Sequence, residues 1–266
     1  MKAVVIIPAR YGSKRFPGKA LAEIRGFDGT AKSLIRRSWE TAREVNFVDA
    51  VHVATDDQRI RDHAEQFGAQ VLMTSSECRN GTERCAEALK SLDADIDVVV
   101  NLQGDAPLIP PAFVEQLIYS LSSDQSVGVA TPVLRCDSHA LGKFVQDRQE
   151  NRVGATTVVF DADWRALYFS KEIIPYVGRD QVAEMAGDIF HHIGVYAYRR
   201  ASLEAYAQWP EGRLESREGL EQLRYLENGE PVLCVEVDAR GREIQEVNNP
   251  VDVVRMEAIL HAERHR

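Results

Sequence analysis

Short apolar segments alternate with amphipathic segments along the first part of the chain, and this alternation limits the fold more than any other feature. The apolar, β-branched segments predict buried strands over residues 3–8, 50–54, 70–73 and 97–102. Apolar residues at helical spacing predict helices over residues 32–45, 58–67 and 82–92. Strands that alternate with helices form βαβ units, in which the strands are parallel. We therefore expect an α/β fold with a mostly parallel sheet.

Polar residues follow three of these predicted strands directly. They occupy residues 10–19, 55–57 and 103–105. Open parallel sheets bind ligands at the carboxyl ends of their strands, so the three polar segments are expected to meet at one binding edge.

The loop that follows the first strand, PARYGSKRFPGK at residues 8–19, concentrates positive charge. It contains two glycines and the four basic residues Arg10, Lys14, Arg15 and Lys19. Backbone N–H groups beside glycines, together with Arg and Lys side chains, bind phosphate oxygens. The loop has neither the GxxxxGK[ST] pattern nor the GxGxxG dinucleotide turn. We interpret it as a cradle for a triphosphate, and the alternative is a solvated basic loop.

Two further polar segments carry candidate functional residues. Asp105 follows the strand over 97–102, where a hard carboxylate is suited to bind Mg²⁺ beside a triphosphate; the alternative is an ordinary turn aspartate. Asn80 precedes the helix over 82–92, and Glu83 stands three residues later, as in a helix capping box. A capping role for Asn80 is compatible with a second role in binding.

Composition restricts the class of partner. The net charge of −9 and the pI near 5.4 disfavour binding to nucleic acid through a broad basic face. The apolar runs are far shorter than the ~20 residues of a membrane helix, and we expect no secretory leader. Four cysteines without CxxC spacing are expected to be reduced thiols. We therefore expect a cytoplasmic protein that binds neither nucleic acid nor membranes.

The second half of the chain has a different pattern. Strands are predicted over 127–134, 156–160, 166–169, 194–198 and 231–237, and helices over 214–226 and 250–263. Glu215, Glu218 and Glu221 are expected to form a charged face of the helix over 214–226. No stretch is rich enough in Pro, Gly or Ser to separate two domains, so we predict a single domain over residues 1–266.

Several motifs in one order resemble the sugar-activating cytidylyltransferases, above all the 3-deoxy-manno-octulosonate (Kdo) cytidylyltransferases. Besides the basic loop, they are VATD at 53–56, NGTER at 80–84, NLQGD at 101–105, LYFS at 167–170, HIGVY at 192–196 and LEQLR at 220–224. The resemblance covers nearly the whole chain. It implies a Rossmann-like nucleotidyltransferase fold with a small dimerisation subdomain and a homodimer. It also implies transfer of CMP from CTP to Kdo or a Kdo-like 2-keto acid sugar, with release of pyrophosphate.

The resemblance also implies a role for each matching residue. About residues 1–125 would bind CTP, and about 126–266 would bind the acceptor and form the dimer. The triphosphate would contact Arg10, Ser13, Arg15 and Lys19, and the cytosine and ribose would contact Asn80, Gly81, Thr82 and Arg84. Arg10, Arg15, Lys19 and a Mg²⁺ ion on Asp105 would stabilise the charge that develops during the reaction. The acceptor would contact Gln103, His192, Tyr196, Glu221 and Gln222.

Alternatives exist for the acceptor residues. His192 and Tyr196 are also compatible with strand residues whose hydrogen bonds are satisfied within the protein. Glu221 and Gln222 are also compatible with the polar face of an amphipathic helix. A metal site on the pair His191 and His192 is disfavoured, because adjacent strand residues point to opposite faces.

The sequence differs from the family pattern near the expected metal site. Asn248 stands where the family has an aspartate that is a second Mg²⁺ ligand, so the site loses one negative charge. Glu246 and Asp252 are the candidates to compensate. Thr157 and Ala106 also stand where the family has a lysine and a glutamate. These changes leave open an alternative acceptor, a small phosphonate such as phosphonoformate.

Two other classes of function are weighed against the transferase. The first is a protein that binds CTP without turning it over, a hypothesis motivated by Asn248. The second is a nicotinamide-dependent dehydrogenase on a similar sheet, which the missing GxGxxG fingerprint disfavours. Pyrophosphate release and NAD(P) binding distinguish the three.

Overall fold

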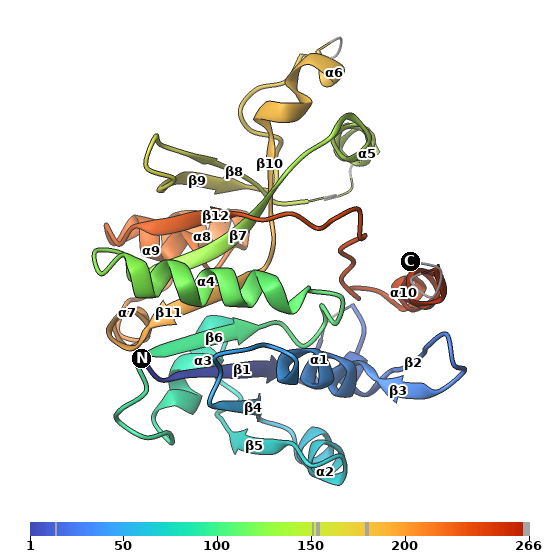
Figure 1. Ribbon diagram of the computed structural model, residues 1–266, viewed down its shortest axis with the longest axis vertical. Helices are drawn as coiled ribbons and strands as arrows, with labels where there is room; N and C mark the ends of the chain where they lie inside the picture. Colours follow the sequence, from blue (N-terminus) through green and yellow to red (C-terminus); the bar gives the residue numbers. More distant parts are fainter. Residues whose placement is uncertain (14, 151, 153–154, 179–180, 263–266) are drawn as a thin grey trace. The chain divides into compact units, whose positions relative to one another are not determined.

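The computed structural model describes residues 1–13, 15–150, 152, 155–178 and 181–262. The chain divides into two compact units, which are coloured along the sequence in Figure 1. Unit 1 consists of Met1–Glu115 and Ala239–Arg266, and unit 2 of Gln116–Asp238. The C-terminal segment therefore belongs to the same unit as the N-terminus.

Unit 1 is built on four parallel strands. They lie in the order β5 (Gln70–Met73), β4 (Ala50–Thr55), β1 (Ala3–Ala9) and β6 (Val98–Leu102). Every residue of β1 and β6 is buried, as their continuous apolar sequences predict. Val5 of β1 is paired with Val51 of β4 on one side and with Val100 of β6 on the other. The prediction of an α/β fold with a parallel sheet is confirmed for this unit.

Three helices connect these strands and pack against them. They are α1 (Leu34–Arg43), α2 (Gln58–Gln66) and α3 (Gly81–Leu89). Each begins at a side chain that accepts a hydrogen bond from the first turn: Ser33, Asp57 and Asn80 respectively. The sequence predicts all three helices, with ends that differ by a few residues.

The remaining elements of unit 1 join its two chain segments. They are η1 (Lys19–Leu21), β2 (Glu23–Arg25), β3 (Ala31–Ser33) and the C-terminal helix α10 (Pro250–Ala262). In Figure 1, α10 in red lies beside the blue β2–β3 hairpin. Ile24, Leu34, Val247 and Met256 form a buried cluster that fixes the C-terminal segment in this position.

The helix α4 (Pro111–Ser123) contains the boundary between the units. It is thirteen residues long, as is α10. Among the residues that the structure describes, no helix combines the length and the apolar character needed to cross a membrane.

Unit 2 contains a mixed sheet around β7 (Val129–Arg135). β10 (Phe190–His192) and β11 (Val195–Arg199) pair antiparallel to β7, and β12 (Val232–Glu236) pairs parallel to it. β8 (Thr157–Phe160) pairs with β10 and with β9 (Ala166–Ser170), antiparallel in both cases. The other elements are α5 (Ser138–Gln149), α6 (Val182–Met185), η2 (Ala186–Asp188) and α7 (Arg200–Tyr206).

The predicted helix over 214–226 is wrong. The structure has two short helices there, α8 (Arg213–Glu218) and α9 (Leu223–Glu227). Gly219 ends α8 because it adopts a left-handed conformation, with φ of 63°, which glycine adopts without steric cost. Glu221 and Gln222 therefore lie in the turn between two helices. Glu215 is only 5% exposed, so the predicted charged helix face is wrong as well.

The break at Gly219 leads to a stability prediction. Gly219→Ala should lower the free energy of unfolding by about 1 kcal/mol, because a Cβ atom is strained in the left-handed region. Gly142→Ala is the matched control: Gly142 lies inside α5 with open space around it, so alanine there should be neutral or stabilising. Urea unfolding of both variants measures the difference, and equal midpoints would contradict the role of Gly219.

Candidate functional site

A cavity of about 500 Å³ opens in unit 1 at the carboxyl ends of β1 and β6. Its lining consists of Pro8, Ala9, Arg10, Ser13, Arg15, Lys19, Ala20, Cys78, Arg79, Asn80, Gly81, Arg84, Gln103, Gly104, Asp105 and Asn248. Every predicted site residue of unit 1 is among them except Thr82, which is buried within α3. Lys14 of the basic loop lies outside the described residues.

The basic loop is curled by its own backbone. The amides of Ser13 and Gly18 both donate to the carbonyl oxygen of Tyr11, at 2.9 and 2.8 Å. The guanidinium of Arg59 lies over the Tyr11 ring, 3.3 Å from its centroid, and donates two hydrogen bonds to Asp57. The loop is therefore held against the start of α2, which fixes the positions from which its cations extend.

The start of α3 forms another part of the cavity wall. The side-chain oxygen of Asn80 accepts from the amide of Glu83 at 2.8 Å, so the predicted N-cap is confirmed. Arg84 is 3% exposed and lies 3.3 Å from a carboxylate oxygen of Asp56, at the end of β4. Its Nη1 also donates to Thr74 at 2.6 Å. This guanidinium is therefore fixed and its charge is balanced before any ligand binds.

Two lining residues of this wall are absent from the sequence prediction. Cys78 and Arg79 directly precede Asn80, and the carbonyl of Arg79 accepts from Nη1 of Arg10 at 3.4 Å. The signal that would have found them is their adjacency to the NGTER segment.

Asp105 forms an ion pair with Lys19 at the end of β6. The Lys19 ammonium also donates to the carbonyl oxygen of Val247 at 3.3 Å. The backbone amide of Val247 donates to the carbonyl of Asp105 at 2.9 Å, which holds the C-terminal segment against this turn. Both charged side chains are only about one-fifth exposed, at 19% for Lys19 and 20% for Asp105, so water screens their attraction weakly.

Asn248 bridges a cation and a carboxylate. Its side-chain oxygen accepts from Nη2 of Arg15 at 2.8 Å, and its side-chain nitrogen donates to Glu246 at 3.2 Å. Burial and the neighbouring charge of Asp105 raise the pKa of the Glu246 carboxyl. Asp252 accepts from the amides of Asn248 and Asn249 at 2.9 and 2.7 Å, so it is committed to the start of α10.

The donor set on this wall consists of hard oxygens. Asp105 and Asn248 offer a carboxylate and an amide oxygen, which suit Mg²⁺. Within the described part of the chain, no three His, Cys, Asp or Glu side chains are grouped in a way that would hold a metal by themselves. An ion held by one or two protein carboxylates and by the phosphates of a substrate fits such a site.

The predicted acceptor residues of unit 2 are also brought together. The rings of His192 and Tyr196 lie 5.5 Å apart, and the Tyr196 hydroxyl donates to the side-chain oxygen of Gln222 at 3.0 Å. Glu221 is the preceding residue, and its carbonyl accepts from the Tyr206 hydroxyl at 3.2 Å. His192, Tyr196 and Gln222 are each less than 7% exposed.

Hydrogen bonding fixes the tautomer of His192. The Thr131 hydroxyl lies 2.8 Å from the carbonyl oxygen of Val195, to which its single hydrogen is donated. The same hydroxyl lies 2.9 Å from Nε2 of His192 and therefore accepts from it, which leaves Nδ1 of the ring without a proton. Burial and the charge of His191 lower the pKa of His192 to about 3, so the ring is neutral at physiological pH.

Gln222 has an unused donor. Its side-chain oxygen accepts from Tyr196, but its side-chain nitrogen has no hydrogen-bond partner among the described residues. Gln222 is 2% exposed, so water does not readily satisfy this N–H group, and an unsatisfied buried donor costs about 1–3 kcal/mol. A ligand with an acceptor oxygen would remove this cost.

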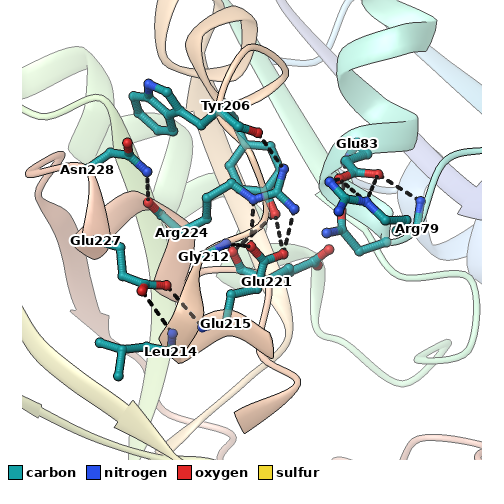
Figure 2. Close-up of polar contacts among 12 residues, drawn as sticks. Arg79, Glu83, Tyr206, Gly212, Leu214, Glu215, Glu221, Arg224, Glu227 and Asn228 are labelled. Carbon is teal, nitrogen blue, oxygen red and sulfur yellow. Dashed lines mark hydrogen bonds and ion pairs between the residues drawn. The ribbon is translucent and has the colours of Figure 1, made fainter. Parts of the chain in front are cut away.

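A buried ion pair fixes the turn that carries Glu221 and Gln222 (Figure 2). Arg224 donates from Nε and Nη2 to the two carboxylate oxygens of Glu215, both at 2.6 Å. The same carboxylate accepts from the amide of Gly212 and from the Tyr206 hydroxyl, at 3.0 and 3.3 Å. The sequence does not reveal this pair, because it depends on the break at Gly219 that turns α9 back toward α8.

Comparisons with known proteins bear on this site. The profile of a family described as cytidylyltransferase matches residues 4–234. A 3-deoxy-manno-octulosonate cytidylyltransferase of Maricaulis maris is 43% identical over 99% of this chain and 98% of its own length. An 8-amino-3,8-dideoxy-manno-octulosonate cytidylyltransferase of Shewanella piezotolerans is 41% identical over 98% of this chain and 99% of its own length.

A solved structure is similar over the full length. It is a CMP:2-keto-3-deoxy-manno-octonic acid synthetase in complex with CTP, with a TM-score of 0.83 and 36% identity. The match covers 99% of this chain and 100% of that one. The Rossmann-like nucleotidyltransferase fold expected from the sequence is thereby confirmed.

The buried pair leads to a prediction for unit 2. Arg224→Met should lower the free energy of unfolding by about 3–5 kcal/mol, because Glu215 is left as a buried charge without its partner. Arg61→Met removes an exposed ion pair with Glu65 and should cost less than about 1 kcal/mol. Urea unfolding distinguishes the two, and a similar small loss for both would contradict the importance of burial.

The protonation state of the His192 ring is tested by titration. Its pKa of about 3 lies below the ordinary value of 6.5, so the unfolded chain binds the proton more readily between these values. The free energy of unfolding is therefore not reduced by His192 above about pH 6.5, and it decreases as the pH falls from there toward 3. An NMR titration of the His192 ring should show no change between pH 8 and about 5. A midpoint near 6.5 for His192 would refute the neutral ring.

Proposed function

The chain belongs to the cytidylyltransferase family, and from this premise we propose that it transfers CMP from CTP to 3-deoxy-manno-octulosonate (Kdo) or a Kdo-like 2-keto acid sugar. An anionic oxygen of the acceptor, which has given up its proton, attacks the α-phosphorus. The bond from this phosphorus to the oxygen that bridges to the β-phosphate breaks, and pyrophosphate leaves with that oxygen. The relatives named for Kdo and for an 8-amino-Kdo support this acceptor class, as does the CTP complex of the similar structure.

The observation that carries the proposal is the cavity of unit 1. Its walls bring the cations of a curled loop to the carboxyl end of β1, beside a carboxylate at the end of β6. Phosphoryl transfer requires mainly positioning and neutralisation of charge, and this lining offers both without a protein nucleophile. We assign the triphosphate to Arg10, Ser13, Arg15 and Lys19.

The cytosine and ribose are assigned to the start of α3, through Asn80, Gly81, Thr82 and Arg84. The side-chain oxygen of Asn80 caps the helix, and Arg84 is held by Asp56 and Thr74. A fixed wall suits the recognition of a flat base, because little conformational freedom is lost when the base binds. Thr82 is buried rather than lining the cavity, so its contribution is to hold this wall.

A Mg²⁺ ion is assigned to Asp105 and Asn248. When bound, the ion would neutralise negative charge on the phosphates of CTP. Lys19 contacts Asp105, and Arg15 contacts Asn248, so a cation lies beside each proposed ligand of the ion, within reach of an anionic triphosphate. Arg10, Arg15 and Lys19 would stabilise the charge that grows on the phosphate oxygens as the bond breaks.

In unit 2, the acceptor is assigned to His192, Tyr196, Glu221 and Gln222. For Gln103, which lines the cavity of unit 1, contact with the acceptor stays a prediction from the family resemblance. Sugars are recognised by directional hydrogen bonds, which buried neutral groups provide. The unused donor of Gln222 and the unprotonated Nδ1 of His192 offer one donor and one acceptor for such bonds. A phosphonate acceptor has no support from the relatives described above.

Two further expectations complete the proposal. We propose a homodimer on the family resemblance alone, and light scattering of the purified protein tests it. We propose a cytoplasmic location, which the four buried free thiols support.

The acceptor prediction is tested by measuring Mg²⁺-dependent pyrophosphate release from CTP. Kdo, 8-amino-Kdo, a nonulosonic acid and phosphonoformate form the panel. Release is expected with Kdo, 8-amino-Kdo or both, because the relatives are named for these sugars. Release with phosphonoformate alone would overturn the acceptor class. Binding of CTP without release for any acceptor would favour the non-catalytic alternative.

The assignment of charge stabilisation is tested by substitution. Lys19→Ala and Asp105→Ala should each reduce kcat by at least ~100-fold, because each removes a group that faces the reacting phosphates. Lys90→Ala, an exposed charge at the end of α3, is the control and should leave the rate unchanged. Unchanged turnover in the Lys19 or Asp105 variant would remove that residue from the mechanism.

A further inference from the structure

The ammonium group of Lys19 lies in a position lined by oxygen atoms. It forms an ion pair with Asp105 and donates to the carbonyl oxygen of Val247 at 3.3 Å. The carboxyl of Glu246, the residue before Val247, also interacts electrostatically with this ammonium and with Asp105. A carboxylate, a backbone carbonyl and a second carboxylate are the hard ligands that divalent cations prefer. The place of Lys19 is therefore suited to a cation other than an ammonium.

Asn248 alone does not supply the charge for such an ion. Its amide oxygen is neutral and is engaged by Arg15. Asp252 is committed to two backbone amides at the start of α10. Glu246 differs from both, because it offers a carboxylate, and this carboxylate accepts a hydrogen bond from the Asn248 side chain at 3.2 Å.

We propose that Glu246 supplies the second carboxylate of the divalent-cation site, beside Asp105, and that the Lys19 ammonium occupies this site in the nucleotide-free protein. The inference rests on the proposed function, because the triphosphate of CTP is the anion that draws Lys19 away. Once Lys19 contacts phosphate, two carboxylates without a cation between them repel each other. A divalent ion relieves this repulsion, and the negative charge of Glu246 replaces the charge that Asn248 lacks.

The experiment measures Mn²⁺ binding to the nucleotide-free protein by electron paramagnetic resonance of the free ion. Mn²⁺ prefers the same oxygen ligands as Mg²⁺. Lys19→Met removes the competing ammonium, so it should bind Mn²⁺ at least about 10-fold more tightly than the wild type, a change within the range that ligand surroundings produce. Adding Glu246→Gln to this variant should abolish the gain in Mn²⁺ affinity.

Two further double variants provide controls. Glu243→Gln, added to Lys19→Met, removes the same charge from an exposed residue of the same segment and should leave the gain intact. Asp105→Asn should abolish the gain as Glu246→Gln does. Circular dichroism and thermal unfolding establish that each variant is folded. Asn248→Asp, added to Lys19→Met and Glu246→Gln, should restore Mn²⁺ binding by returning one carboxylate.

The outcomes separate the claims. An Mn²⁺ affinity of Lys19→Met equal to that of the wild type overturns the role of Lys19. A gain that survives Glu246→Gln but not Asp105→Asn overturns the role of Glu246 alone. A gain that survives both substitutions overturns the site. The transferase activity itself stands or falls separately, on pyrophosphate release by the wild-type protein.

Discussion

The burial of β1 between two parallel neighbours is the constraint on which the candidate site depends. Val5 is paired with Val51 and with Val100, so the three strands β1, β4 and β6 run in the same direction in a fixed register. Their carboxyl ends therefore lie side by side, and the polar residues that follow each strand meet. The cavity of unit 1 combines the loop after β1 with the turn after β6, while Asp56, after β4, holds the buried Arg84. Apolar strands with no functional side chain thus determine where the functional side chains lie.

The two units compensate the charge of their polar side chains in different ways. In unit 1, charged side chains at the cavity are paired with charges of opposite sign, as in the pairs Lys19–Asp105 and Arg84–Asp56. A charged ligand is accommodated there by exchange, because phosphate can take the place of a carboxylate beside a cation. In unit 2, three of the clustered polar side chains are neutral: a histidine with a strongly lowered pKa, a tyrosine and a glutamine. The buried ion pair Arg224–Glu215 fixes the backbone turn that carries two residues of this cluster.

The sequence predicts unit 1 better than unit 2 for a physical reason. Strands such as β1 and β6 are buried on both faces, so their apolar character is continuous and visible in a short window. The basic loop and the Asn80 cap are local motifs at strand and helix ends. Unit 2 depends on long-range contacts that a local pattern does not contain. The predicted helix over 214–226 is wrong because periodicity does not register the left-handed turn at Gly219. The local sequence predicts that Glu215 lies at the surface, because the buried ion pair with Arg224 forms only in the folded chain.

The return of Ala239–Arg266 to unit 1 is the other feature that the sequence does not reveal, and it matters for the chemistry. The segment is held by the buried side chains of Val247 and Met256 and by the hydrogen bond from the Val247 amide to Asp105. Its apolar anchors set the position of Glu246 and Asn248 on either side of Val247. The family resemblance at position 248 alone implies the loss of a carboxylate. The structure shows that a carboxylate two residues earlier bonds to that same side chain, so the charge at this wall depends on the segment as a whole.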